Sequence, residues 1–154
     1  MSLRILLLCL LLQSNYFAQK VFELARTGSA KQMTKYLAKH PDHLNLRSEQ
    51  GASPLLLASY HGNYAVAEIL LNAGADPNEC FIEGAPIYGV IFKADSLMLD
   101  LLIKKGANIN LPCQFDELGY PIHLAINLQR IEQIKQLLAA GARLDVRDAQ
   151  GRTI

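Results

Sequence analysis

One unit of sequence recurs along this chain at nearly constant intervals. Three prolines open apolar stretches, and three glycines close Leu-Leu runs and are each followed by alanine. The prolines are Pro54, Pro86 and Pro121, and the glycines are Gly74, Gly106 and Gly141. In both sets the intervals are 32 and 35 residues. Anchors that share the same intervals indicate a tandem repeat, in which each structural unit contacts only its neighbours.

The residues of one unit predict two helices followed by an extended finger. Ser53 can cap a helix by accepting a hydrogen bond from a backbone N–H, and Pro54 suits the first helical position, where its missing N–H costs nothing. Gly62 permits a sharp reversal, and Gly74 can close a second amphipathic helix in a left-handed turn. Residues 76–78 are turn formers. Because neither helix can bury its apolar side alone, the units must stack.

The repeated residues resemble the ankyrin repeat, whose pattern reads Gly-x-Thr-Pro-Leu-His-x-Ala, then Gly, then a Leu-Leu helix ending in Gly-Ala-Asp-x-Asn. The matching positions are Gly51, Ser53, Pro54, Leu55, Ala58, Gly62, Leu70, Leu71, Gly74, Ala75, Asp76 and Asn78 in the first clear repeat, Pro86, Leu101, Leu102, Gly106, Ala107 and Asn110 in the second, and Pro121, His123, Ala125, Leu137, Leu138, Gly141, Ala142 and Asp145 in the third. The resemblance implies an all-α solenoid of stacked helix-turn-helix units with short β-hairpin-like fingers, about four repeats plus the start of another.

We predict the repeat boundaries from this pattern. Residues 19–50 keep parts of it but lack the Thr-Pro start, so they form a divergent N-terminal capping repeat. Full repeats follow at 51–82, 83–117 and 118–150, and 151–154 begin a further one. Two departures concern helix starts: Ala85 and Tyr120 stand where a capping hydroxyl belongs, which costs about 1 kcal/mol each. Ala94 stands at the position of Gly62.

Residues 1–18 are expected to be a secretory signal peptide. Arg4 precedes an unbroken apolar run from Ile5 to Leu12, and polar residues follow. Eight apolar residues span about 12 Å as a helix, too short to cross a bilayer core of about 30 Å. A buried N-terminal helix is the alternative, although the run has no polar side. We therefore expect an exported protein, periplasmic or secreted, with no stable membrane anchor after cleavage.

Composition excludes one class of partner. The chain has 154 residues, of which 51% are hydrophobic and 19% charged, enough for one globular domain. Its 15 basic and 14 acidic residues give a formal charge of +1. With no excess of positive charge, the sequence gives no indication of a nucleic-acid partner.

No motif for catalysis, cofactor binding or metal binding is present in the sequence. His40 and His43 have a His-x-x-His spacing, but the adjacent proline and the turn setting favour a solvated turn over a metal site. Catalysis by His123 would need a nucleophile and base that the sequence does not supply. The resemblance instead implies that this histidine joins the turn before its helix by hydrogen bonds to the backbone. We expect no enzyme activity, no cofactor and no metal.

Cys80 and Cys113 fall at neighbouring register positions on adjacent fingers. An exported protein can form disulfides, and this one would stabilise the fold by roughly 3–4 kcal/mol in the chain-entropy model. The alternative is two free thiols held apart by the packing distance between repeats. The packing distance favours free thiols.

The resemblance implies that fingertips and the outer side of each first helix bind partners across a curved groove. The matching positions are Glu49, Gln50, Tyr60 and His61 in the first clear repeat, Phe81, Ile82, Phe92 and Lys93 in the second, and Asp116, Glu117, Asn127 and Leu128 in the third. Tyr60 and Phe92 align, and aromatic side chains in a groove suit protein recognition. They could equally pack back onto the stack as core.

We expect a monomeric protein–protein interaction module that binds an unidentified protein partner through its concave groove. The alternative function is that of a structural or regulatory segment in a larger exported protein that continues beyond Ile154.

Overall fold

The computed structural model describes residues 19–80, 84–112, 119–147, 151 and 153. Residues 19–27 are helical, and the later elements are α2 (Ala30–Leu37), the 3-10 helix η1 (Pro41–Asn45), α3 (Pro54–Tyr60), α4 (Tyr64–Asn72), α5 (Pro86–Lys93), α6 (Ser96–Lys104), α7 (Pro121–Asn127) and α8 (Ile131–Ala139). The expected signal peptide lies outside the described residues. The repeat boundaries stay predictions.

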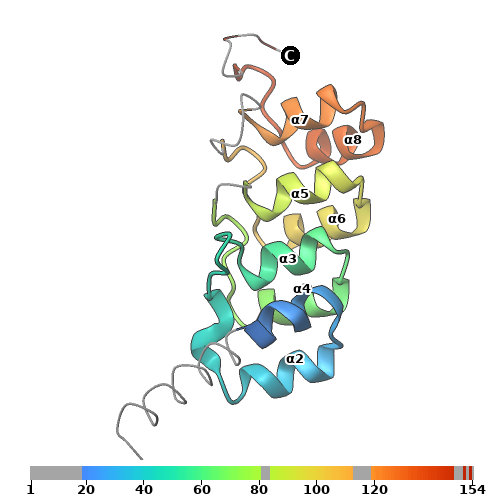
Figure 1. The fold of residues 1–154 in the computed structure, drawn as a ribbon. Helices are drawn as coiled ribbons and strands as arrows, with labels where there is room; N and C mark the ends of the chain where they lie inside the picture. Colours follow the sequence, from blue (N-terminus) through green and yellow to red (C-terminus); the bar gives the residue numbers. More distant parts are fainter. Residues whose placement is uncertain (1–18, 81–83, 113–118, 148–150, 152, 154) are drawn as a thin grey trace, which may run out of the picture.

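The helices pair and the pairs stack in chain order, from α2 at one end to α7 and α8 at the other (Figure 1). In each pair the chain reverses through a short turn, so α3 packs on α4, α5 on α6 and α7 on α8. Between pairs, α5 packs against both α3 and α7. Over the described residues no strand is present, and an antiparallel bridge joins Arg147 to Thr153. The predicted all-α stack of helix-turn-helix units is confirmed.

The recurring prolines do open helices. Pro54, Pro86 and Pro121 each occupy the first turn of α3, α5 and α7. Ser53 caps α3, because its hydroxyl accepts from Leu56 N at 3.1 Å. Ala85 is the N-cap of α5 and Tyr120 is the N-cap of α7. Neither makes a side-chain hydrogen bond to the helix, as the sequence predicts.

The core is one continuous apolar column. The buried residues of α3 include Leu55 and Leu56, those of α5 Ile87 and Ile91, and the second helices add leucines such as Leu70. The cluster extends from the helix at 19–27 to residues of the last finger. Since each helix pair covers the apolar side of the next, stacking supplies the burial that one pair lacks.

Asparagines join consecutive fingers, the segments that link one helix pair to the next. Asn78, in the finger at 73–85, accepts from Asn108 N at 2.6 Å and donates to Gly106 O at 3.1 Å. Asn110 repeats this one unit later, accepting from Arg143 N at 2.9 Å and donating to Gly141 O at 3.2 Å. One amide side chain per repeat therefore fixes the register between neighbouring fingers.

Tyr88 occupies the position that corresponds to His123 in the next repeat. It is almost fully buried, and its hydroxyl lies 2.7 Å from Leu111 O and 2.8 Å from Gly119 O. The Tyr88 hydroxyl therefore lies within hydrogen-bonding distance of two backbone carbonyls, one in the middle and one near the end of the third finger (residues 105–120). The tyrosine at this position thus contacts backbone of the finger that leads into the neighbouring unit.

Candidate functional site

Three of the predicted binding residues come together where α3 and α5 end. Tyr60 is the last residue of α3, and Phe92 and Lys93 are the last two of α5. The Lys93 ammonium lies 4.5 Å from the centroid of the Tyr60 ring, a cation–π distance. Tyr60 is 38% exposed and Phe92 54%. We call these three residues the helix-end cluster.

Gly89 explains how Tyr60 reaches α5. A Cβ at this position would lie 3.2 Å from Cδ2 of Tyr60, closer than side chains normally approach. The missing side chain therefore leaves room for the tyrosine ring against the helix. Tyr60 thus packs partly onto the stack while keeping an exposed edge, and Phe92 stands well out of the core. Packing back onto the stack therefore holds for part of Tyr60, and a role of either ring in partner recognition stays a prediction.

Three further predicted residues lie at the ends of α3 and α7. His61 is exposed and sets its ring edge-on to Tyr60, with centroids 5.5 Å apart. Asn127 is the exposed last residue of α7, and Leu128 caps that helix half-buried. The Arg130 guanidinium donates to Phe92 O at 2.9 Å, which ties the end of α5 to the turn between α7 and α8.

Glu49 and Gln50 lie elsewhere, in a cavity at the first finger (residues 38–53). The cavity has a volume of about 550 Å³ and is lined by the helix at 19–27 and by this finger. Sequence reasoning missed two of its lining residues, Arg26 and Arg47. Both lie in the divergent capping repeat, where no position aligns clearly with the repeat pattern.

Arg47 is fixed between two fingers. It forms an ion pair with Glu79 on the next finger, and its guanidinium also donates to Gly51 O at 3.4 Å. Desolvation lowers the pKa of the Arg47 guanidinium, but arginine starts so far above neutrality that the charge persists. The cavity wall therefore contains both the Arg47 guanidinium, which Glu79 holds in place, and the side chain of Glu49.

Several predicted residues lie outside the part of the chain that the structure describes: Phe81, Ile82, Asp116, Glu117 and Cys113. Cys80 is described and is disulfide-bonded. For Cys80 the favoured free thiol is therefore wrong. That expectation used the spacing of packed helices, whereas the Asn78–Asn108 contact shows that adjacent fingers approach to hydrogen-bonding distance. The Cys80–Cys113 pairing stays a prediction.

His40, His43 and His123 pack against neighbouring side chains. The Tyr36 hydroxyl lies 2.7 Å from His43 Nδ1, and His43 stacks on His40 with centroids 5.1 Å apart. The sequence predicted a solvated turn here. His43 is instead half-buried, because the 3-10 helix folds it back on α2. His123 is buried beside Tyr120. No group of three His, Cys, Asp or Glu side chains suited to a metal occurs in the described ranges.

Comparison with known proteins identifies the repeat. The family described as "Ankyrin repeat" matches residues 50–80. Cyclin-dependent kinase 4 inhibitor B of Bos taurus is 33% identical over 66% of this chain and 77% of its own length. The chain belongs to the ankyrin repeat family. Other ankyrin relatives are longer: the target of rapamycin complex 2 subunit AVO2 of Saccharomyces cerevisiae is 30% identical over 82% of this chain but only 30% of its own length.

The ankyrin repeats of this chain also match part of a multidomain protein. Ankyrin repeat and SAM domain-containing protein 4B of Mus musculus is 51% identical over 27% of this chain and 10% of its own length. Ankyrin repeats are generally protein-interaction modules without catalytic activity of their own. None of the helices that the structure describes combines the length and apolarity needed to cross a membrane.

Proposed function

We propose that this ankyrin domain recognises a protein partner through its concave face, with the helix-end cluster at the centre of the contact. The supporting observation is the contact of Lys93 with the Tyr60 ring, beside an exposed Phe92 at the end of the same helix as Lys93. Two partly exposed aromatic rings and a lysine held over one of them offer apolar area with little side-chain freedom left to lose.

The cavity at the first finger would form a second, polar part of the same contact. Arg26 can pair with a carboxylate of a partner, while Glu49 offers an acceptor. An aromatic centre with charged groups around it matches the usual anatomy of protein interfaces. The predicted finger residues Phe81, Ile82, Asp116 and Glu117 belong to this proposal without structural support.

The test is affinity capture followed by measurement of affinity for the captured protein. Tyr60→Ala and Phe92→Ala should each weaken the affinity at least about tenfold, as expected for central aromatic anchors. Tyr64→Ala is the matched control, because Tyr64 is 44% exposed but opens α4. Circular dichroism checks that each variant folds. Equal affinities for all three variants would remove the cluster from the interface.

A second candidate function is that of a structural or regulatory ankyrin segment in a longer protein. The supporting observation is that Arg147 donates to Gly151 O at 2.7 Å, as Arg47 does to Gly51 O before the first clear repeat. The contact made before the first clear repeat therefore recurs at Gly151. The reading frame of the gene beyond Ile154 tests this candidate.

We also propose that the chain is exported and acts as a monomer. The charged start and apolar run of residues 1–18 support export. Fusing these 18 residues to a reporter enzyme should direct it out of the cytoplasm, and a reporter that stays inside would contradict export. Sedimentation of the protein at several concentrations tests the monomer.

A further inference from the structure

The first unit of the stack carries positive charge that the rest of the chain does not share. Residues 19–50 contain six basic and three acidic side chains, whereas residues 51–154 contain eight basic and eleven acidic ones. Lys31, Lys35 and Lys39 follow one another at intervals of four along α2 and just beyond it, and all three are exposed. They therefore form one row on one side of the helix. We call these three lysines the basic end face.

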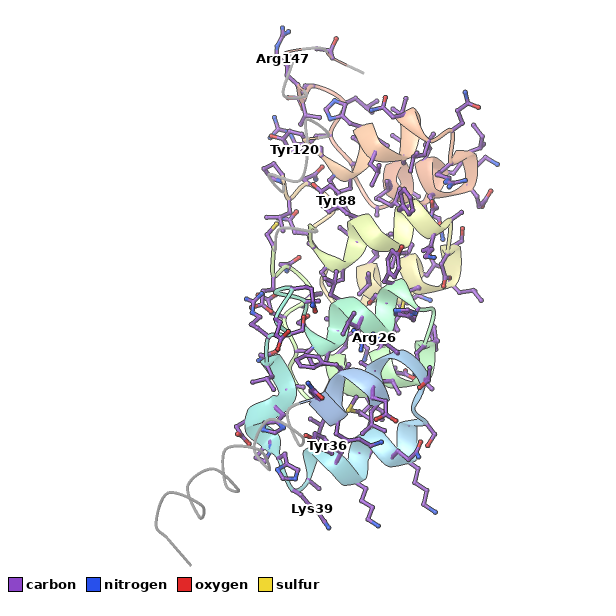
Figure 2. The ribbon with its side chains drawn as sticks, in the orientation of Figure 1. Arg26, Tyr36, Lys39, Tyr88, Tyr120 and Arg147 are labelled. Atoms are coloured by element: carbon purple, nitrogen blue, oxygen red, sulfur yellow. The ribbon has the colours of Figure 1, made fainter. Side chains whose placement is uncertain are left out.

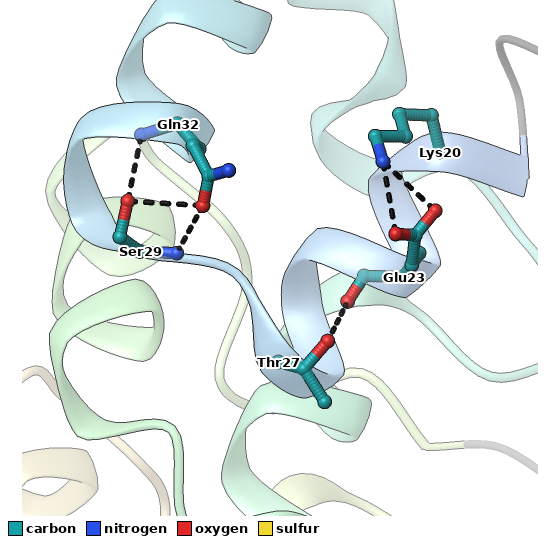
Figure 3. A network of polar contacts seen from close by, with 5 residues as sticks. All are labelled: Lys20, Glu23, Thr27, Ser29 and Gln32. Carbon is teal, nitrogen blue, oxygen red and sulfur yellow. Dashed lines mark hydrogen bonds and ion pairs between the residues drawn. The ribbon is translucent and has the colours of Figure 1, made fainter.

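The nearby carboxylates of this unit contact other side chains. Both Glu23 oxygens accept from the Lys20 ammonium at 2.9 Å (Figure 3). The Asp42 carboxylate lies 3.6 Å from Nε2 of His43. No acidic residue lies in α2 itself, and among the described residues no ion pair involves the basic end face. The charge of the three lysines is therefore available to a partner.

Helix stability does not account for the row. Ser29 and Gln32 already satisfy the start of α2 through a capping box. Lys31 is the second residue of the helix, where the helix dipole disfavours a cation, and like charges four residues apart repel each other. Only Lys35, in the last turn, gains from the dipole. A terminal repeat needs a polar outer face for solubility, but not a face of one sign.

The basic end face borders a hollow with apolar groups in its wall. A cavity of about 350 Å³ is lined by Lys35 and Lys39 together with Leu24 and Tyr36. Lys39 points away from the stacked repeats at this end of the molecule (Figure 2). Ammonium groups beside such a hollow match a ligand that carries negative charges and an apolar group on the same side.

The spacing of the lysines indicates the form of this ligand. A helix rises about 1.5 Å per residue, so lysines four residues apart are separated by about 6 Å along the axis. Carboxylates at every fourth residue of a second helix have the same spacing, and a leucine between them would enter the hollow. A nucleic-acid backbone also carries closely spaced charges but offers no apolar group for the hollow.

We propose that the basic end face binds an acidic amphipathic helix of a protein partner. Carboxylates at every fourth residue of that helix pair with the lysines, and an apolar side chain from the same side fills the hollow. The helix-end cluster lies on α3 and α5, so this is a second contact that goes beyond the proposed function.

The probe is a fluorescein-labelled helical peptide with glutamates at every fourth position and a leucine beside them. Fluorescence anisotropy measures its affinity for the full chain at about 0.1 M ionic strength, where exposed charges more than about 10 Å apart are largely screened. We expect binding that weakens as salt is added. A peptide of the same composition without this spacing should bind at least about fivefold more weakly, and so should a peptide with alanine in place of the leucine.

Lys35→Glu in the protein should weaken peptide binding at least about fivefold, because an attraction becomes a repulsion. Lys104→Glu is the matched control: Lys104 is likewise exposed in the last turn of its helix, α6, and its reversal should change binding less than about twofold. Tyr60→Ala should leave peptide binding unchanged, which separates this contact from the helix-end cluster. If circular dichroism shows that Lys35→Glu does not fold, Lys35→Gln and Lys104→Gln replace the pair.

Four outcomes would overturn the proposal. The first is no measurable binding of the peptide. The second is equal binding of the peptides with and without the four-residue spacing, which would mean that only their charge matters. The third is an equal loss in the Lys35 and Lys104 variants. The fourth is Lys35-dependent binding to single-stranded DNA or to phosphatidylserine vesicles that is tighter than binding to the peptide.

Discussion

Among the described residues, two other than glycine adopt the left-handed backbone conformation, and both lie in the turns within helix pairs. Ala94 has φ of 58° and Gln129 has φ of 55°, at the position where the first clear repeat has Gly62 with φ of 69°. An L-residue with a side chain pays about 1–2 kcal/mol for this conformation. The stack therefore imposes the same turn on all three units, including those whose sequence disfavours it.

Ala94→Gly is expected to raise the free energy of unfolding by about 1 kcal/mol, because relief of the strain exceeds the extra entropy that glycine loses on folding. Urea denaturation of the two chains measures the difference. The control is Ala65→Gly, at an exposed position inside α4, which should cost about 1 kcal/mol. Destabilisation by both changes would show that the turn at Ala94 is not strained.

Single helices differ in how well their starts are satisfied, although their backbones are nearly identical. Ala85 has φ −80° and ψ 163°, and Ser53 has φ −83° and ψ 162°. The Ser53 hydroxyl accepts from Leu56 N, whereas α5 begins without any side-chain acceptor. Helix α6 shows the opposite case, since Asp95 accepts from Met98 N at 3.0 Å and caps it.

Ala85→Ser is expected to stabilise the protein by about 1 kcal/mol, because the backbone already places a hydroxyl where it can accept from Tyr88 N. The reverse change in the first clear repeat, Ser53→Ala, should cost a similar amount. Thermal unfolding followed by circular dichroism compares the two variants with the natural chain. A melting temperature lowered by Ala85→Ser would mean that burial of the hydroxyl outweighs the new cap.

Cohesion of the whole molecule depends on links between neighbouring units. The helices bury a common apolar column, the Asn78 and Asn110 amides connect the fingers, and Arg47 pairs with Glu79 across two fingers. Cys80 is disulfide-bonded, and the predicted pairing with Cys113 would add a covalent link between fingers. In a stacked array, stability is approximately the sum of the unit terms and these interface terms.

If Cys80 pairs with Cys113, Cys113→Ser should lower the free energy of unfolding by roughly 3 kcal/mol, because the open chain has more conformations when unfolded. Reduction of the natural chain should have the same effect, and denaturation with and without reductant measures both. Cys9→Ser is the control and should change nothing. A Cys113→Ser chain that keeps its sensitivity to reductant would refute the pairing.

The amino-acid sequence by itself determined the order of helices and turns. Three signals mark the helix ends: proline at the first helical position, a capping serine, and glycine with positive φ. Each acts within a few residues of its own position, so each can be recognised from the local sequence. The same signals at equal spacing identified the fold and placed Tyr60 and Phe92 at corresponding helix ends. The departures at Ala85 and Tyr120 were likewise readable, because a missing hydroxyl needs no tertiary context.

The tertiary structure alone decided which residues meet across units. The ring of Tyr60 under the Lys93 ammonium and the cavity of Arg26 and Arg47 both join residues from different elements. So does the approach of adjacent fingers. Such contacts depend on the register and separation of stacked helix pairs, which packing of side chains sets at distances that no local signal encodes.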